Sequence, residues 1–563
     1  MKKLINDPVA VVPEMLEGLV AADPSLALVT GENVVVRADS PARREVALVA
    51  GGGSGHEPAH AGYVGRGMLH GAVAGGVFAS PAPDAVLAAI RATAGPAGCL
   101  LIIKNYTGDR LNFGLAAAVA RAEGIPVETV VVADDVAIPD DGGTAGRRGI
   151  AGTVLIHKIA GAAAAAGLDL AAVKAEAEAA MADLGTMGVG LSPCILPGAA
   201  APNFTLGADE IELGLGIHGE PGVRRAAMMP ADTLVDTLLD AIVADRRLAP
   251  GDRVALLVND LGGTTPMELA VVTRRAILSL GRRGIAVERS YAGRFLSALD
   301  MAGVSLSVLK VDTARLARLD APTSAPAWPN APATGPGGRR IAPPQAAVAA
   351  PRQGASGGPA APRLAAALKA VADRLLAAED SLSEMDREVG DGDIGTSLAR
   401  GARALQAVPV GGDAAAAGMA LAAEWRRAVG GTSGPLYAIF LLRAAERLAA
   451  PLPGEAPAVT WAEAFLAGCA GIAALGGAER GDRTMLDALW PAAETFHERV
   501  AAGAAPAAAW TAAIAAARAG ADATRAMTAR RGRSSYLGAR VLGRPDPGAE
   551  AAVVWMEAAA PFV

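Results

Sequence analysis

Three aspartates alternate with glycines in one short stretch of the sequence, Asp386-Arg387-Glu388-Val389-Gly390-Asp391-Gly392-Asp393-Ile394-Gly395-Thr396. Carboxylate oxygens are the ligands that Mg²⁺ prefers, and a protein-bound Mg²⁺ usually keeps waters or substrate phosphates as its other ligands. Glycines also let backbone N–H groups approach phosphate oxygens closely. The stretch therefore favours a metal and nucleotide site, with a solvated turn or a calcium loop as alternatives. Its spacing is that of neither a P-loop nor an EF-hand.

Helices are expected on both sides of this acidic loop. Apolar residues recur before it at the spacing of a core-facing helix, which we expect to end shortly before Asp386. These apolar positions are Leu364, Leu368, Val371 and Leu375. Thr396 or Ser397 can cap a second helix that begins at Leu398, and its free N–H groups would lie beside the loop, where a phosphate could bind.

Further glycine-containing turns precede helical patterns in the same half of the chain. They are residues 430–435, 481–487, 533–538 and 546–549. Each one taken singly is an ordinary interhelical turn, but together they favour a nucleotide site built from several loops.

In the first half of the chain, polar loops follow short apolar runs. Residues 46–49 precede the glycine loop 51–62, residues 100–103 precede 104–109, and residues 254–258 precede 259–265. Alanine-rich helical stretches lie between them, so the pattern predicts an α/β region with largely parallel sheets. Because ligands in such sheets bind at the carboxyl ends of the strands, all three loops are expected at one crevice.

Six polar residues of this half could do chemistry: His56, His60, Lys104, Asp109, His218 and Glu220. The chain has six histidines, and three of them lie in or beside glycine-rich motifs. A single loop histidine is more often a hydrogen-bonded structural residue than a catalyst. A three-histidine zinc site is the sharper alternative to a catalytic site.

Composition limits the class of protein. A chain of 563 residues exceeds one hydrophobic core, so two to four domains are expected. With 52% hydrophobic residues, 19% charged residues and a net charge of −6, it should be globular and should not bind nucleic acid. Its three cysteines form no C-x-x-C pair, which indicates a reducing cytoplasm and no disulfide framework.

No membrane segment is expected. Asn6-Asp7-Pro8 follows the first lysines after only two apolar residues, so the apolar segment of a signal peptide is missing and none is predicted. The alanine-rich run 160–172 is broken by Asp169 and is too short to span a bilayer, so it predicts a buried helix.

Changes in composition divide the chain into three parts. Residues 1–319 form the α/β region, residues 320–362 are rich in proline, alanine and glycine and predict a linker, and residues 363–563 predict an all-α domain.

Four of these motifs, in this order along the chain, resemble the single-chain, ATP-dependent dihydroxyacetone (glycerone) kinase family. They are residues 51–62, 103–109, 216–222 and 390–393. The resemblance implies that His218 binds the ketone carbon of the substrate as a covalent hemiaminal, with Asp109 and His56 as the acid/base pair. It also implies a substrate-binding set of Gly53, Ser54, Gly55, His56, Lys104, Asp109 and His218.

In the second domain, the resemblance implies a helical barrel or bundle that binds Mg·ATP. Asp386, Asp391 and Asp393 would hold the metal, with two Mg²⁺ ions bridging the ATP phosphates. The implied nucleotide contacts are Asp393, Ile394, Gly395, Thr396, Thr432, Ser433, Thr484, Met485, Asp546, Pro547 and Gly548. Ile394 departs from the family, which is often polar at that position.

The implied activity is ATP-dependent phosphorylation of dihydroxyacetone to dihydroxyacetone phosphate. Fusion of both domains in one chain favours ATP over the phosphotransferase system as the donor. A kinase for another short ketose such as erythrulose, a side activity on FAD, and a non-catalytic regulator that senses ketose or nucleotide are the alternatives. The resemblance also implies a cytoplasmic homodimer in which the nucleotide domains are swapped.

Overall fold

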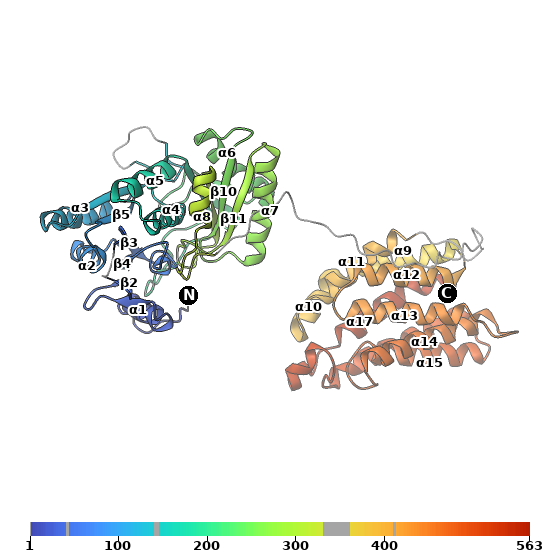
Figure 1. Cartoon of the computed structure of the whole chain (residues 1–563). Helices are drawn as coiled ribbons and strands as arrows, with labels where there is room; N and C mark the ends of the chain where they lie inside the picture. Colours follow the sequence, from blue (N-terminus) through green and yellow to red (C-terminus); the bar gives the residue numbers. More distant parts are fainter. Residues whose placement is uncertain (1, 41–43, 140–145, 330–360, 409–412) are drawn as a thin grey trace. The chain divides into compact units, whose positions relative to one another are not determined.

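The computed structural model of the chain describes residues 2–40, 44–139, 146–329, 361–408 and 413–563. The chain divides into two compact units, Met1–Ile341 and Ala342–Val563. The described residues of the first unit form two sheets with helices around them, and those of the second unit form helices without strands (Figure 1). The predicted combination of an α/β region and an all-α region is therefore confirmed.

The first sheet has six strands in the order β1-β2-β4-β3-β5-β6. Its strands are β1 (Leu26–Leu28), β2 (Val34–Arg37), β3 (Ala47–Ser54), β4 (Gly71–Val77), β5 (Cys99–Lys104) and β6 (Val127–Val132). β4, β3, β5 and β6 pair in parallel, as predicted, because helices α2 (Pro83–Thr93) and α3 (Thr107–Ala122) return the chain to the same edge.

The second sheet differs from the predicted parallel arrangement. Its strands, in the order β11-β10-β12-β7-β8-β9, are β11 (Ala286–Gly293), β10 (Arg253–Asp260), β12 (Gly303–Lys310), β7 (Leu184–Gly190), β8 (Glu210–Leu213) and β9 (Arg224–Ala227). β10 pairs in parallel with β11, to which α7 (Pro266–Arg282) connects it. All the other strand pairs of this sheet are antiparallel. Residues 294–302 contain no helix and are too few for a crossover, so β12 must return in the opposite direction.

The strands of the first unit are buried on both faces. Leu48 and Ala50 of β3 face the core that both sheets share, and Ala47 and Val49 face the core under α2 and α3. Helix α4 (Thr153–Ala165) lies almost wholly buried in the shared core, which explains its continuous apolar sequence. The other helices of this unit are α1 (Val11–Ala22), α5 (Leu170–Ala182), α6 (Ala231–Asp245) and α8 (Thr313–Asp320).

The alanine-rich run 160–172, predicted as one buried helix, is divided between two helices. α4 ends at Ala165, and the Asp169 side chain caps α5 by accepting a hydrogen bond from the Ala172 N–H at 2.8 Å.

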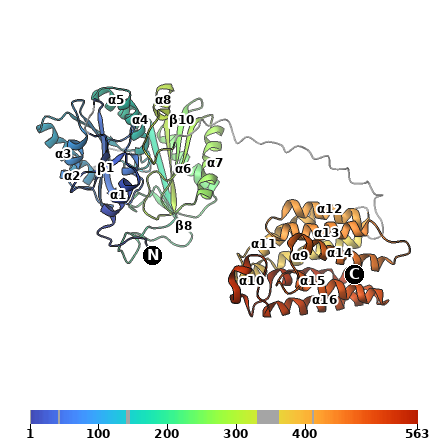
Figure 2. The same cartoon turned by 60° about the horizontal axis from the view of Figure 1, so that its bottom comes forward.

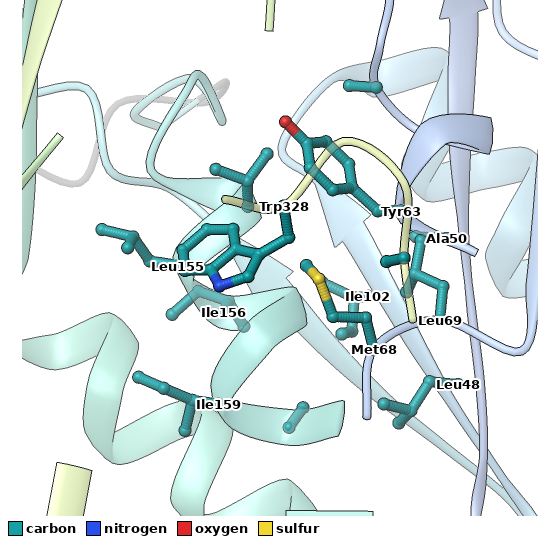
Figure 3. Close-up of a cluster of buried hydrophobic side chains, with 14 of the residues drawn as sticks. Leu48, Ala50, Tyr63, Met68, Leu69, Ile102, Leu155, Ile156, Ile159 and Trp328 are labelled. Carbon is teal, nitrogen blue, oxygen red and sulfur yellow. The ribbon is translucent and has the colours of Figure 1, made fainter. Parts of the chain in front are cut away.

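The start of the predicted linker belongs to the first unit. Asp320 ends α8, and Ala325 and Trp328 are buried in the shared core. The Trp328 ring lies 4.7 Å from the Tyr291 ring, and Figure 3 shows it beside Leu155 and Ile156 of α4. The linker prediction is therefore wrong for residues 320–329, because one buried aromatic side chain anchors a segment whose composition is otherwise that of a linker. Residues 330–360 of the predicted linker lie outside the described residues.

Trp328→Ala is expected to lower the free energy of unfolding of the first unit by about 3–5 kcal/mol, because it leaves a cavity in a packed core. Denaturant unfolding of the full chain measures this change. Trp461→Ala is the matched control, since the Trp461 side chain is 45% exposed. Equal effects of the two substitutions would contradict the assignment of residues 320–329 to the core.

The second unit packs its helices side by side around one apolar core (Figure 2). They are α9 (Ala361–Ala377), α10 (Glu379–Val389), α11 (Ile394–Gln406), α12 (Ala414–Ala428), α13 (Ser433–Leu448), α14 (Pro457–Gly476), α15 (Leu486–Ala501), α16 (Pro506–Ala523) and α17 (Pro547–Ala559). Among the described residues, only α14 is long and apolar enough to cross a membrane, by length and composition alone. Its Phe465, Cys469 and Ile472 join the core, as in the core helix of a globular unit.

Candidate active site

Strand β3 extends through the glycines that were predicted to form a loop, since it ends at Ser54. A Cβ atom at Gly52 would lie 2.9 Å from Lys104 Nζ, and a Cβ atom at Gly51 would overlap the Val73 carbonyl oxygen. The missing side chains therefore let a neighbouring strand and a buried lysine approach the β3 backbone. The prediction of a loop was wrong for Gly51–Ser54 because strand pairing overrode the weak strand propensity of glycine.

Two histidines from distant parts of the first unit meet beyond the end of β3. His56 follows β3, and His218 lies between β8 and β9, yet their Nε2 atoms are 3.0 Å apart. The His218 Nδ1 atom lies 2.7 Å from Glu220 Oε1, and the His218 backbone N–H donates to Glu220 Oε2. The His56 Nδ1 atom lies 2.7 Å from the carbonyl oxygen of Ser297. The structure thus joins His56, His218 and Glu220 in one chain of hydrogen bonds.

Lys104, at the end of β5, and Asp109, in the first turn of α3, are both buried near these hydrogen-bonded side chains. Asp109 accepts a short hydrogen bond from the Ser80 hydroxyl, and a Cβ atom at Gly52 would lie 3.4 Å from Asp109 Oδ2. Burial lowers the pKa of Lys104, although the charges of Asp109 and Glu220 oppose this shift. A buried cation between carboxylates is a suitable anchor for the hydroxyl groups of a small polar substrate.

Burial also controls the proton affinity of the histidine chain. It holds the pKa of His56 well below the usual range, and the nearby positive charge of Lys104 acts in the same direction. Burial alone would raise the pKa of Glu220, but the hydrogen bond and charge attraction from His218 outweigh it and lower the pKa to about 2. Glu220 is therefore an ionised carboxylate at neutral pH.

Aromatic side chains that we did not select from the sequence form walls around the two imidazoles. The Phe78 ring stacks on His56 at 5.1 Å, and the Tyr106 ring meets His218 edge-on at 4.9 Å. Tyr106 lies inside the motif 103–109, so it could have been selected as a site residue from the sequence. Phe78 and Ser80 lie in none of the motifs, so the sequence provided no reason to select them. Apolar walls keep water away from a reactive nitrogen.

One sequence candidate, His60, lies outside this hydrogen-bonded arrangement. The His60 Nδ1 atom pairs at 2.9 Å with His157 Nε2 in the core. Asn259, predicted to follow the strand, instead lies in β10, where its Oδ1 accepts hydrogen bonds from the N–H groups of Phe295 and Leu296. The first two predicted loops meet at this site, and the third contributes through Leu261, which packs in one apolar cluster with Phe78. Among the described residues, no histidine belongs to a cluster of three side chains that could ligate one metal ion, which disfavours the zinc alternative.

In the second unit, the three aspartates come together. Asp386, Asp391 and Asp393 each offer a carboxylate oxygen, and these oxygens lie within 4.8 Å of one another. Asp386 Oδ2 accepts from the Asp393 N–H at 2.9 Å, so the Gly-rich turn folds around it. Such a group of exposed and half-buried carboxylates repels itself unless a cation is present, so its donor set fits Mg²⁺.

The helices around this acidic turn begin and end at other residues than predicted. Asp386 lies in the last turn of α10 and not in a loop, and α11 begins at Ile394 with Asp393 at its N-cap position. Thr396 is therefore inside the helix, where its hydroxyl donates to the Asp393 carbonyl oxygen at 2.9 Å. Asp393 occupies the N-cap position without a side-chain capping hydrogen bond, so the capping residue expected from the sequence did not locate the start of α11.

The other predicted nucleotide contacts form two groups. Thr432 and Ser433 start α13, and a Cβ atom at the preceding Gly431 would lie 3.5 Å from Asp393 Oδ2. Near α17, a Cβ atom at Gly548 would lie 3.5 Å from the Met485 Cβ atom. Thr484 precedes Met485, and Pro547 is the first residue of α17.

Asp546 caps α17 by accepting from the Ala549 N–H at 2.9 Å, and burial raises its pKa to about 6. An ion pair between Arg544 and Glu388 links this segment to the helix that carries Asp386.

Comparison with known proteins identifies related sequences along both units. The Dak1 domain model matches residues 17–327, and the DAK2 domain model matches residues 388–561. The human triokinase/FMN cyclase is 45% identical and covers 99% of this chain and 98% of its own length. The D-erythrulose kinase of Mycolicibacterium smegmatis is 38% identical and covers 98% of this chain and 96% of its own length.

A crystal structure of the dihydroxyacetone kinase of C. freundii in complex with AMP-PNP and Mg²⁺ is similar along the whole chain. The match covers 100% of this chain and 99% of that chain, with 36% sequence identity and a TM-score of 0.64. The resemblance predicted from the four motifs is confirmed by these matches. The chain therefore belongs to the dihydroxyacetone kinase family and is a kinase that transfers a phosphoryl group to an alcohol.

Proposed function

We propose that this chain phosphorylates dihydroxyacetone, with ATP as the phosphoryl donor, in the cytoplasm. The observation that carries the proposal is the position of His218, whose ring nitrogens lie between Glu220 and His56 while Lys104 and Asp109 are buried close by. The relatives support it, since a kinase with bound AMP-PNP and Mg²⁺ matches the whole chain. The three free and buried cysteines, Cys99, Cys194 and Cys469, agree with a reducing compartment.

The first unit would capture the ketone chemically. The His218 Nε2 lone pair adds to the carbonyl carbon, the carbon–oxygen π bond breaks, and the oxygen takes a proton to give a hemiaminal. Asp109 then accepts the proton of the terminal hydroxyl as that oxygen attacks the γ-phosphorus. Lys104 would orient the hydroxyls. Gly53, Ser54 and Gly55 would line the site, because their backbone runs beside His56.

The second unit would hold the nucleotide. Asp386, Asp391 and Asp393 would hold Mg²⁺, two ions in our proposal, and the metal would neutralise phosphate charge when it is bound. The residues near Gly431, Met485 and Asp546 would surround the nucleotide.

The test is ADP release, coupled to a spectrophotometric readout, with dihydroxyacetone, longer ketoses and glycerol as acceptors. We expect dihydroxyacetone to give the highest kcat/KM and glycerol, which has no carbonyl group, the lowest. Equal turnover of glycerol and dihydroxyacetone would contradict ketone capture. No ADP release with any ketose would favour the non-catalytic regulator.

A four-carbon ketose is the second candidate substrate. The D-erythrulose kinase of M. smegmatis covers almost the whole chain, which supports it. Capture at the carbonyl carbon does not depend on the length of the ketose. The same assay distinguishes the two, because erythrulose would then exceed dihydroxyacetone in kcat/KM.

We further propose a homodimer in which the helical unit of one chain serves the ketose unit of its partner. Mixing inactive Asp109→Asn chains with inactive Asp391→Asn chains should then restore activity, because a mixed dimer contains one site with both native halves. With random pairing and independent sites, recovery should approach about one quarter of the native activity. Each unmixed variant is the control for residual turnover.

The chains must be co-expressed with different affinity tags, so that mixed dimers can be isolated and counted. If each helical unit serves its own chain, every site in a mixed dimer carries one defect. Isolated mixed dimers without activity would therefore rule out the swap.

A further inference from the structure

The hydrogen-bond partners of His56 and His218 fix where two of their protons lie. The His56 Nδ1 atom faces the Ser297 carbonyl oxygen at 2.7 Å, and a carbonyl oxygen can only accept. The His218 Nδ1 atom faces Glu220 Oε1 at 2.7 Å, and an ionised carboxylate can only accept. Both Nδ1 atoms therefore carry a hydrogen. A neutral imidazole has one N–H, so two neutral rings would leave both Nε2 atoms with lone pairs only.

The two Nε2 atoms nevertheless lie 3.0 Å apart, at hydrogen-bonding distance. Two lone pairs at this distance repel each other, whereas one proton between them makes a hydrogen bond. We propose that the ketone-free enzyme holds a third proton on the His56–His218 pair, that Glu220 is the residue that stabilises it, and that this proton protonates the carbonyl oxygen when the ketone is captured. The pair then carries one positive charge, and the Glu220 carboxylate balances it.

The surrounding charges place this third proton on His218. Lys104 lies close enough to His56 to disfavour a second positive charge there, and burial acts in the same direction. His218 instead lies against Glu220, which binds it through both the ring and the backbone N–H. A side chain at Gly216 would overlap both Glu220 Oε2 and Arg148, so Arg148 lies close to the same carboxylate. Glu57, Asp109 and Asp134 are the other carboxylates near Lys104.

The transfer of this proton to the substrate rests on the proposed ketone capture, and its protons and charges balance. His218 must free its Nε2 lone pair, so its proton passes through the hydrogen bond to His56. The nitrogen–carbon bond forms, the π bond breaks, and the carbonyl oxygen takes the proton from His56. The product is a substituted imidazolium with its Nδ1–H still on Glu220, a neutral hydroxyl group and a neutral His56. The total charge is unchanged, so capture requires no proton from solvent.

A second histidine pair in the same unit serves as an internal control. His60 and His157 are also joined by one hydrogen bond, between His60 Nδ1 and His157 Nε2 at 2.9 Å. Their outer nitrogens, His60 Nε2 and His157 Nδ1, have no hydrogen-bond partner in the described part of the chain. No acceptor therefore fixes a hydrogen on either outer nitrogen, and two protons satisfy the pair.

Nitrogen NMR of the full chain labelled with ¹⁵N-histidine counts these protons without substrate. The chain has six histidines, so single His→Gln variants assign the signals. At neutral pH we expect three protonated nitrogens for His56 and His218, and two for His60 and His157. Two protonated nitrogens on the His56–His218 pair would overturn the proposal. Glu220→Gln keeps an acceptor but removes the charge, so it should reduce the count on this pair from three to two.

Titration with dihydroxyacetone tests the destination of the proton. Calorimetry in buffers of different ionisation enthalpy should show no net proton uptake by the native enzyme and uptake of about one proton by Glu220→Gln. Affinity should fall about 10- to 100-fold in that variant, because a charge-assisted hydrogen bond is lost. Net uptake by the native enzyme would overturn the assigned path. Failure of ketone capture itself is separate, since an unshifted ¹³C carbonyl signal of bound dihydroxyacetone would reveal it while leaving the proton count intact.

Discussion

Asp391→Asn should lower kcat by at least about 100-fold while leaving the fold intact. The reason is that a metal held by this carboxylate would stabilise the charge of the transition state by several kcal/mol. Its carboxylate lies within 4.8 Å of those of Asp386 and Asp393, and the side chain is exposed, so removal of its charge leaves no cavity. Steady-state ADP release measures the loss, and EDTA should produce a comparable loss in the native enzyme.

Asp380→Asn is the matched control for this prediction. Asp380 is an exposed residue in the first turn of α10, the helix whose last turn carries Asp386, so the same charge is removed away from the proposed metal. We expect activity close to native for this variant. Full turnover by Asp391→Asn, or insensitivity of the native enzyme to EDTA, would show that the metal assignment is wrong.

His218→Ala should reduce the preference for dihydroxyacetone over glycerol by roughly 100-fold or more, because a site loses that much selectivity when the group that recognises one substrate feature is removed. The effect should appear mainly as a higher KM for the ketone, since bond formation to the carbonyl carbon holds the substrate. Glycerol has no carbonyl group, so its already low kcat/KM should change much less.

His497→Ala is the control, because His497 lies on α15 in the other unit. Unfolding curves of both variants should match the native curve, which separates chemistry from stability. An unchanged KM and an unchanged ketone preference in His218→Ala would remove the covalent mechanism.

Local patterns in the sequence were sufficient for the fold class and for two of the six strands of the first sheet, β3 and β5. Apolar runs followed by helical patterns predicted the parallel strands β3 and β5, because a strand and the helix after it are adjacent in the sequence and leave a local pattern there. The antiparallel pairs of the second sheet depend on how residues 294–302 turn, and no local periodicity encodes that direction. The packing of Trp328 likewise depends on a tertiary contact with Tyr291, in a segment whose own composition is that of a linker.

The site was predictable where a motif carries its own chemistry. His56, Lys104, Asp109 and His218 were selected from the sequence, and the structure places them together in one unit. Ser80, Phe78 and Ser297 were missed because each contributes through a contact made only after folding: a hydrogen bond to Asp109, a ring stacked on His56 and a carbonyl oxygen at His56 Nδ1. The assigned roles of all these residues stay predictions until the variants are measured.

The glycines of β3 also limit how the substrate range of this enzyme could be changed by directed evolution. A side chain at Gly53 would approach the backbone of Phe78 at 2.8 Å, and a side chain at Gly52 would meet Lys104. Libraries that randomise this strand should therefore yield mostly misfolded clones, whatever ketose is used for selection. Phe78 and Tyr106 already present side chains toward the imidazoles, so we expect substitutions there, and not in β3, to change which acceptor is used.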